Sequence, residues 1–194
     1  MDENDDDRAR WNKRYDTKDY IFGEKPHEFL AKNLDLFPKG KALVLAMGEG
    51  QDAVFLAENG FEVEACDVSP KAVQKAEELA RQKGVAIKAF EADLERFKLG
   101  LEKYDLITCF YYLQRDLIPQ IKAALKQDGM VVIETFTVEN LRLGFPGPRR
   151  KEFLLKENEL SAFFRDLKVI IYRESVIDGR KAVASIIAQK IAPG

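Results

Sequence analysis

Between residues 41 and 136, short apolar runs alternate with longer stretches that contain both apolar and polar residues. Short apolar runs, typical of buried strands, are separated by stretches whose apolar residues recur at helical spacing. The runs predict strands at 41–47, 61–66, 85–91, 104–110 and 130–136. The stretches between them predict helices at 52–59, 70–83 and 117–127. Strands that alternate with helices form a parallel sheet with helices on both faces, so this part of the chain predicts an α/β fold.

The N-terminal forty residues lie outside this alternation. Residues 2–7 are a run of charges that predicts a solvated, frayed tail, although acids also suit the first turn of a helix. A short helix is expected over 8–15, and a second helix is expected to begin at Pro26. We therefore expect residues 1–40 to form an N-terminal helical cap segment.

The C-terminal part also departs from the alternation. A long loop is expected over 137–151, followed by a helix over 157–165. Two apolar runs at 167–177 and 181–191 then flank Asp178-Gly179, a dipeptide typical of a tight β-hairpin turn. The chain should therefore end in an antiparallel pair of strands.

These elements together predict one fold class. We expect a Rossmann-like, seven-stranded, mostly parallel sheet with a C-terminal antiparallel hairpin and helices on both faces. A chain of 194 residues suits a single domain, in which residues 41–194 form the Rossmann-like core.

Composition narrows the function classes. The net charge of −2 provides no basic field for a phosphate backbone, which argues against a nucleic-acid partner. The apolar runs are much shorter than a membrane span, and the acidic N-terminus is unlike a signal peptide. Cys66 and Cys109 are expected to be thiols in a reducing compartment. We expect a cytoplasmic monomer or homodimer that does not bind membranes.

The most informative motif joins the first two predicted strands. Gly48 and Gly50 follow the first strand, and Asp67 ends the second. Glycines let the backbone approach a ligand closely, and an acid at this distance binds ribose hydroxyls in Rossmann-like sites. The motif also fits G-x-G-x-x-A, so a nicotinamide-dependent oxidoreductase is one hypothesis. Against it, the chain offers no second nucleotide-binding half, and Asp93 follows the third strand, where a polar group can meet an adenine.

This arrangement resembles the class I S-adenosylmethionine-dependent methyltransferases, and most of all their tellurite-resistance and thiopurine branch. Further segments similar to that branch are Trp11-Asn12-Lys13-Arg14-Tyr15, AVFLAENGFEVEACDVSPKAV (53–73) and GPRRKEFLLKENEL (147–160). The resemblance implies S-adenosylmethionine as cofactor and a small-molecule methyl acceptor. Its expected cofactor-binding residues are Trp11, Arg14, Tyr20, Ala46, Gly48, Glu49, Gly50, Asp67, Val68, Asp93, Leu94, Phe110 and Tyr111.

One residue departs from the family's pattern. Ala46 stands where the family usually has an acid that helps to hold the amino group of the methionine tail. Glu49 or Asp52, in the same turn, are candidates to replace that acid. A cofactor-binding protein without turnover is therefore a third hypothesis.

The chain offers no convincing catalytic residue and no metal site. His27 is the single histidine and is expected at the surface. Arg142, Arg149, Arg150 and Lys151 are expected to be solvated, or else to bind an anionic acceptor. Methyl transfer from a sulfonium needs mainly alignment and a dry pocket. The lack of a base favours an acceptor that is already anionic, such as a thiolate or a metalloid.

Overall fold

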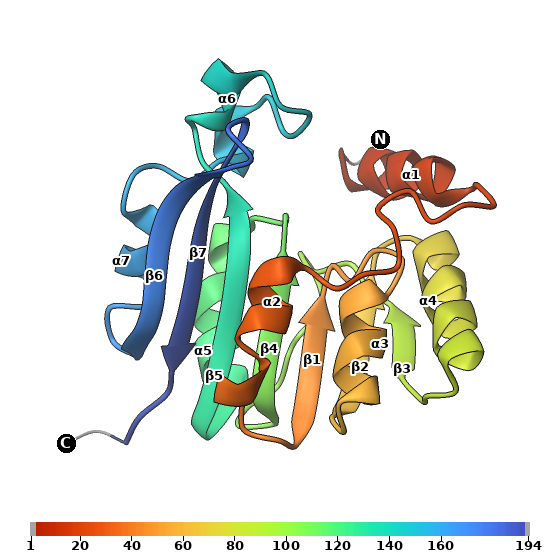
Figure 1. Ribbon diagram of the computed structural model, residues 1–194, viewed down its shortest axis with the longest axis horizontal. Coiled ribbons are helices and arrows are strands. Elements are labelled where there is room, and N and C mark those ends of the chain that lie inside the picture. The colour runs from red at the N-terminus through yellow and green to blue at the C-terminus, as the bar shows by residue number, and fades with distance from the viewer. Residues whose placement is uncertain (1–2, 193–194) are drawn as a thin grey trace. The chain divides into compact units, whose positions relative to one another are not determined.

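The computed structural model describes residues 3–192 and divides into two compact units, Met1–Lys98 and Leu99–Gly194, which are described separately (Figure 1). In the first unit, three parallel strands follow the order β3-β2-β1. Its strands are β1 (Lys41–Leu45), β2 (Glu62–Asp67) and β3 (Lys88–Glu91). Its helices are α1 (Glu3–Tyr15), α2 (Glu28–Lys32), the 3₁₀ helix η1 (Leu34–Leu36), α3 (Gln51–Glu58) and α4 (Pro70–Lys83).

Helix α4 has the bounds that the sequence predicts. The Ser69 side chain accepts a hydrogen bond from the backbone N–H of Ala72, and Pro70 occupies the first turn. Both features are typical of helix starts. Gly84 ends the helix in the left-handed conformation, with φ of 70°.

The acidic N-terminal run is helical where the structure describes it. Helix α1 begins at Glu3, so a frayed tail is wrong for residues 3–7, and Asp2 lies outside the described residues. The helix packs against α4, and Arg8 forms an ion pair with Glu91 at 2.6 Å. Acids in a first helical turn are favoured by the helix dipole, the alternative that the sequence also allowed.

The second unit contains four strands in the order β4-β5-β7-β6. Strands β4 and β5 are parallel, whereas β7 pairs antiparallel with both β5 and β6. The strands are β4 (Tyr104–Phe110), β5 (Leu125–Phe136), β6 (Lys168–Ile177) and β7 (Lys181–Gln189). The helices are η2 (Arg115–Leu117), α5 (Ile118–Ala124), α6 (Asn140–Leu143), η3 (Lys151–Phe153) and α7 (Glu159–Phe163).

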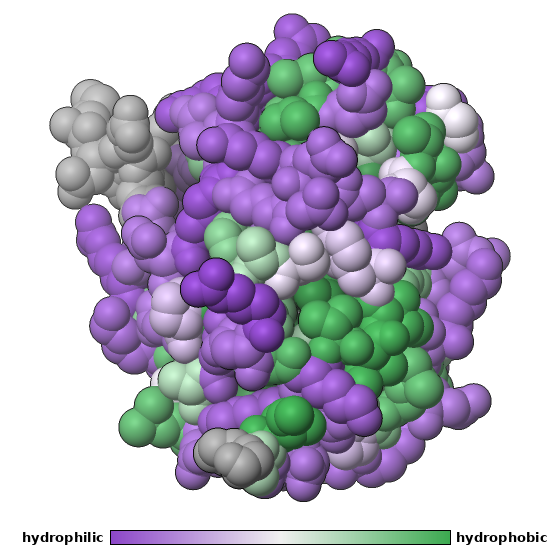
Figure 2. Space-filling model, turned by 90° about the vertical axis from the view of Figure 1, so that its left-hand side faces the viewer, coloured by the Kyte–Doolittle hydropathy of each residue, from purple (hydrophilic) through white to green (hydrophobic). Residues whose placement is uncertain are grey.

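The predicted C-terminal hairpin is confirmed. Lys181 pairs with Ile177, so three residues form the loop between the strands. Asp178 and Gly179 have positive φ, as the central residues of a type I′ turn do, and the Arg180 N–H donates to the Ile177 carbonyl at 3.2 Å. Strand β6 forms the edge of its sheet, and its outward positions include charged residues that discourage pairing with another chain. Figure 2 views the side on which β6 and α7 lie, where a continuous hydrophobic area is bordered by hydrophilic side chains.

The boundary between α5 and β5 differs from the predicted one. The helix expected to reach residue 127 ends at Ala124, and β5 begins at Leu125 rather than at residue 130. Asp128, at φ of 63°, lies within this extension, and the register between β4 and β5 shifts there. The expected loop over 137–151 contains the short helix α6, because it folds back through a bridge between Thr137 and Leu155.

The seven strands and their pairing confirm the expected Rossmann-like fold class, mostly parallel with an antiparallel C-terminal hairpin. Among the described residues, no helix is both long and apolar enough to cross a membrane. The cytoplasmic location, the single-domain organisation and the oligomeric state stay predictions.

Gly50 provides a test of how closely the loop after β1 approaches α4. A Cβ atom on Gly50 would lie 2.5 Å from the Ala76 Cβ and 2.7 Å from the Ala76 Cα, and φ is 92°. At Gly60, φ is 84° but nothing lies within 4 Å of an added Cβ. In urea unfolding, Gly60→Ala should lower the free energy of unfolding by about 1–2 kcal/mol, from backbone strain alone. Gly50→Ala should lower it by at least about 3 kcal/mol, because the overlap with Ala76 adds to that strain. Equal losses would contradict the close approach.

Candidate cofactor site

The loop after β1 has an unusual backbone. Ala46, Gly48 and Gly50 all have positive φ, at 48°, 56° and 92°. The loop is anchored because the Met47 N–H donates to the Cys66 carbonyl at 2.9 Å, and the Gly50 N–H donates to the Met47 carbonyl at 3.1 Å. A positive φ is rare outside glycine, so Ala46 is a strained residue of the kind found at functional sites.

Asp67, at the end of β2, holds this loop in place. Its Oδ2 accepts a hydrogen bond from the Gly48 N–H at 2.9 Å, and its Oδ1 accepts one from the Ser69 N–H at 3.0 Å. The residue is only 7% exposed. Burial raises the pKa of Asp67 to about 6, although the backbone N–H groups of Ser69, Gly48 and Val68 oppose the shift. The carboxylate therefore joins the end of a strand to the glycine loop and to the start of α4.

Tyr15, from α1, covers the glycine loop. A Cβ atom on Gly48 would lie 3.2 Å from the Tyr15 hydroxyl, and Tyr15 itself is buried. Burial, with smaller contributions from Asp67 and Glu49, raises the Tyr15 pKa well above its usual value, so the phenol stays protonated. The Trp11 ring stacks on Tyr15 at 5.6 Å between centroids.

Arg14 and Phe22 complete this aromatic cover. The Arg14 guanidinium lies 5.2 Å from the centroid of Trp11 and 5.1 Å from that of Phe22. Both distances are typical of cation–π contacts. Trp11 and Arg14 are among the expected residues, and Tyr15, which ends the same 11–15 segment that resembles the family, lies against Gly48.

Glu49 has a structural partner. Its side chain is fully buried, and Oε1 accepts a hydrogen bond from the Lys75 ammonium at 2.7 Å. Oε2 accepts one from the Phe22 N–H at 3.1 Å, so the carboxylate also holds the segment after α1. Lys75 in addition donates to the Asp19 carbonyl and to the Thr17 hydroxyl, at 2.7 and 3.1 Å.

Asp52 is engaged as well. Its Oδ1 accepts from the His27 N–H at 2.8 Å, and its Oδ2 lies 2.6 Å from the His27 Nδ1. The His27 side chain is only 21% exposed, so the expected surface position is wrong. The His27 ring contacts the Asp52 carboxylate, a pairing that the sequence does not predict. Both acids that could replace the missing acid at Ala46 thus already have partners.

Gln51, between Glu49 and Asp52 in the sequence, is buried with a side-chain oxygen that the described residues leave unsatisfied. It is 6% exposed, and among the described residues its Oε1 atom has no hydrogen-bond partner. Buried polar atoms are nearly always satisfied, so an orphaned acceptor next to a glycine loop requires an explanation.

The remaining expected residues of the first unit lie around these groups. The Asp93 Oδ1 accepts from the Glu95 N–H at 3.0 Å, and Leu94 is buried. Val68 is half-buried directly after Asp67. Tyr20 packs against α4 and donates its hydroxyl to the Lys75 carbonyl at 3.2 Å.

Phe110 and Tyr111 belong to the second unit. Phe110 ends β4 and is buried, whereas Tyr111 is half-buried with φ of 56°. The Tyr111 hydroxyl donates to the Glu134 Oε1 at 2.9 Å and accepts from the Lys181 ammonium at 2.7 Å. Sequence reasoning missed both partners, because they come from β5 and β7.

The basic residues of the long loop form local ion pairs. Arg142 pairs with Glu139 at 3.1 Å, and Arg150 pairs with Glu152 at 2.6 Å. Both guanidinium groups are well exposed, which fits the solvated alternative. Arg149 and Lys151 are also exposed.

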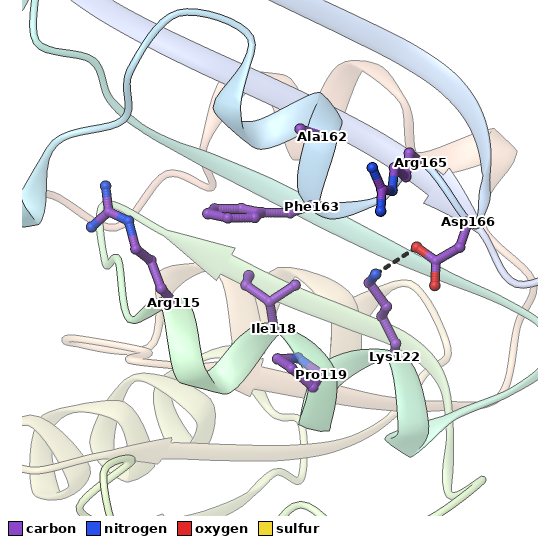
Figure 3. A pocket seen from close by; sticks show the side chains of 8 residues that line it. All are labelled: Arg115, Ile118, Pro119, Lys122, Ala162, Phe163, Arg165 and Asp166. Carbon is purple, nitrogen blue, oxygen red and sulfur yellow. Dashed lines mark hydrogen bonds and ion pairs between the residues drawn. The ribbon is translucent and has the colours of Figure 1, made fainter.

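A separate pocket of about 440 Å³ lies between α5 and α7 in the second unit (Figure 3). Two of the cations that line it pair with acids of the same unit. Arg115 pairs with Glu159 at 2.8 Å, and Lys122 pairs with Asp166 at 2.5 Å. No residue expected at the cofactor site lines this pocket.

The described part of the chain offers little evidence for a metal site or a reactive cysteine. No group of three or more His, Cys, Asp or Glu residues there could hold a metal ion. Both cysteines are buried, and burial raises the pKa of Cys109 to about 12, which suppresses its thiolate.

Comparison with known proteins identifies relatives of the chain. Residues 10–187 match the family model described as tellurite resistance protein TehB. Over 145 residues the chain is 29% identical to "Hemagglutinin 1" of Eikenella corrodens. Over 144 residues it is 23% identical to the "Probable S-adenosyl-L-methionine-dependent methyltransferase TehB" of Haemophilus influenzae. Each match covers 70% of this chain but only 46% and 49% of the relative, so the chain spans about half the length of these curated relatives.

Solved structures share the fold. TehB from Haemophilus influenzae superposes with a TM-score of 0.71 at 20% identity, covering 94% of this chain and 66% of that one. A structure from work on the conversion of a disulfide bond into a thioacetal group during echinomycin biosynthesis gives a TM-score of 0.73 at 16% identity. That match covers 96% of this chain and 93% of the other.

The buried pair of Glu49 and Lys75 should stabilise the first unit. Lys75→Met leaves the Glu49 charge buried without its cation, and we expect the free energy of unfolding to fall by about 3–5 kcal/mol. Lys71, on the same helix, pairs with Asp16 at 3.0 Å where both side chains are well exposed. Lys71→Met is therefore the matched control and should cost less than about 1 kcal/mol in urea unfolding. A loss for Lys75→Met as small as that of the control would show that Glu49 does not depend on Lys75.

Proposed function

Because the chain belongs to the TehB family of tellurite resistance proteins, we propose that it is an S-adenosylmethionine-dependent methyltransferase acting on a small molecule. The family match covers residues 10–187, which include every residue of the glycine loop. The observation that carries the proposal is the bond from the Asp67 carboxylate to the Gly48 N–H, which joins a ribose-binding acid to a glycine loop. The cofactor would supply a methyl group activated by a sulfonium charge.

The residues present fit a nucleoside. The backbone N–H groups of Gly48, Ser69 and Val68 all act on the Asp67 carboxylate. Its two oxygens offer about four acceptor positions, so a ribose hydroxyl could donate to a remaining one. Gly48 and Gly50 leave the loop without side chains on its surface. Val68, Asp93 and Leu94 are proposed to contact the base.

The aromatic cover would close over the bound nucleoside. The Tyr15 hydroxyl lies against Gly48, since a Cβ atom added to Gly48 would lie 3.2 Å from it. We propose that α1 shifts when the cofactor binds. Trp11 and Arg14 move with Tyr15, and Tyr20 lies on the segment that follows. A closed aromatic cover would keep water away from the reacting methyl group.

Gln51 is our candidate to replace the acid missing at Ala46. Glu49 and Asp52 are bound to Lys75 and His27, so neither carboxylate is available without breaking a buried contact. The unsatisfied Gln51 Oε1 is a neutral acceptor that could receive a hydrogen bond from the ammonium of the methionine tail. A neutral amide would hold this group more weakly than a carboxylate, because charge-assisted hydrogen bonds are stronger.

The acceptor is proposed to be a thiol, a metalloid or a similar soft nucleophile. The family name refers to tellurite, which is consistent with this class. In the second unit, Phe110 and Tyr111 are proposed to contact it.

Calorimetric titration with S-adenosylmethionine, S-adenosylhomocysteine and NAD, run in parallel, tests the proposal. Micromolar binding of the first two ligands, lost in Asp67→Ala, is the expected result. Binding of NAD alone would support a nicotinamide-dependent oxidoreductase instead. Binding of S-adenosylmethionine without turnover of thiols or tellurite would support a cofactor-binding protein without activity.

The pKa of Asp67 makes this binding dependent on pH. Only the ionised carboxylate accepts hydrogen bonds at both oxygens, and its pKa of about 6 lies above the ordinary value of 3.8. Lowering the pH through 6 therefore protonates Asp67 and removes affinity, whereas raising the pH restores it. The dissociation constant for S-adenosylhomocysteine should be about tenfold higher at pH 5 than at pH 7.

Asp67→Asn is the control for this prediction. It keeps the shape of the side chain but does not titrate, so its weaker binding should hardly change over the same range. The same pH dependence in both proteins would assign the effect to another group.

A further inference from the structure

Tyr111 has a strained backbone that the second unit stabilises. It directly follows β4, and its φ of 56° is an outlier for a bulky aromatic residue. Glu134 holds it twice, because the Tyr111 N–H donates to the Glu134 carbonyl at 2.8 Å and the Tyr111 hydroxyl donates to the Glu134 Oε1 at 2.9 Å. Strain that is maintained by such specific contacts is characteristic of functional positions.

The hydroxyl lies within a polar chain that runs into the sheet. Lys181 donates to the Tyr111 oxygen at 2.7 Å, and its ammonium lies 4.8 Å from the centre of the ring. The other Glu134 oxygen, Oε2, accepts from the Ser185 hydroxyl at 2.7 Å and from Arg173 at 3.4 Å. Glu134 is only 3% exposed, whereas Tyr111 and Lys181 are half-buried. The chain therefore connects a solvent-accessible phenol to a buried carboxylate.

These groups lie at the edge of the sheet where ligands bind in folds of this class. Tyr111 follows the carboxyl end of β4, and Glu134 is paired with the last residue of that strand, Phe110. Lys181 begins β7, which runs antiparallel to β5 and so reaches the same edge. Open α/β sheets bind their ligands at the carboxyl ends of the parallel strands.

The surroundings suit a small, weakly acidic molecule. Tyr111 packs on Phe136 with 5.0 Å between ring centroids, and Phe145 lies 6.2 Å beyond, which gives an apolar wall. The Lys181 ammonium lies 2.7 Å from the Tyr111 oxygen. Its positive charge favours an anion that forms beside the tyrosine.

We propose that Tyr111 passes the acceptor's proton to Glu134, so that the acceptor arrives protonated, as a neutral thiol. This inference rests on the proposed methyltransferase function. The thiol S–H bond breaks, and its proton binds the Tyr111 oxygen while the phenol's own proton moves to the Glu134 Oε1. The electron pair of the S–H bond stays on sulfur as a thiolate, which the Lys181 ammonium stabilises. The protonated Glu134 later returns its proton to water.

This assignment changes the expectation drawn from the sequence. The sequence alone indicates no base, which favours an acceptor that is already anionic. Glu134 lies on a strand interior and Lys181 follows the hairpin turn, so the base exists only once β5 and β7 pair. Tyr111 and Lys181 would touch the acceptor, whereas Ser185 and Arg173 position the carboxylate.

Rates measured against pH test the relay. With 2-mercaptoethanol as acceptor, Tyr111→Phe should lower kcat/KM by about a hundredfold or more near pH 7, where the thiol is protonated. Near pH 10, where the thiol is already ionised, kcat/KM of Tyr111→Phe should be less than about tenfold below that of the wild type. Tyr172→Phe is the matched control, since it removes a hydroxyl that donates to Glu174 on β6 of the same unit. It should leave the rates unchanged. A Tyr111→Phe deficit that is the same at every pH, or absent, would overturn the proposal.

A second measurement needs no methyl donor. The phenolate of 4-nitrophenol is coloured, so its absorbance reports whether the bound phenol loses its proton. Near neutral pH, the wild type and Tyr172→Phe should increase the bound phenolate fraction by lowering the probe's apparent pKa by about one unit, a tenfold change in the ionisation constant. Tyr111→Phe should abolish most of this shift. No shift in the wild type would overturn the proposal.

The two proposals can fail separately. Absence of S-adenosylmethionine binding would reject the methyltransferase function, whatever the absorbance shows. Binding of the donor together with turnover of tellurite but not of 2-mercaptoethanol would keep that function and reject the neutral thiol.

Discussion

The Asp67 carboxylate is the contact on which the candidate cofactor site depends. It accepts one hydrogen bond from the glycine loop and one from the start of α4, and it does so while almost completely buried. Burial of a carboxylate costs free energy unless hydrogen bonds offset it, and the elevated pKa shows that the offset is incomplete. A ligand that donates further hydrogen bonds to Asp67 would reduce this cost. The site is thus arranged so that binding stabilises the first unit.

The segment before β1 is joined to the same loop by charge and by aromatic packing. Glu49 binds Lys75 and the Phe22 N–H, while Asn12 accepts hydrogen bonds from the Ser69 hydroxyl and from the Lys71 N–H, both at 3.1 Å. These contacts fix the position of α1 relative to α4, and so they place Tyr15 above Gly48. This segment is therefore held against the glycine loop by polar contacts together with the aromatic packing of Trp11, Tyr15 and Phe22.

In the second unit, the proposed proton-transfer group is assembled from residues of several strands. Glu134 is accommodated within a buried strand because Ser185, Arg173 and Tyr111 satisfy its oxygens. Each of these partners comes from a different strand or strand end. A buried, fully bonded carboxylate of this kind is costly to maintain, which is a reason to look for a function. The strained Tyr111 backbone marks the same place independently.

The sequence by itself determined the elements and the motif. Helical and strand periodicity, the Ser69-Pro70 helix start and the Asp178-Gly179 turn are local properties, so α4 and the hairpin were predicted closely. The spacing of Gly48, Gly50 and Asp67 is also local to one strand–helix–strand unit. Only the tertiary structure decided the partners of charged side chains. His27 meets Asp52, Glu49 meets Lys75, and Lys181 meets Tyr111 across separations of 25, 26 and 70 residues. Such pairings arise from packing and desolvation in the folded chain, which no periodicity in the sequence encodes.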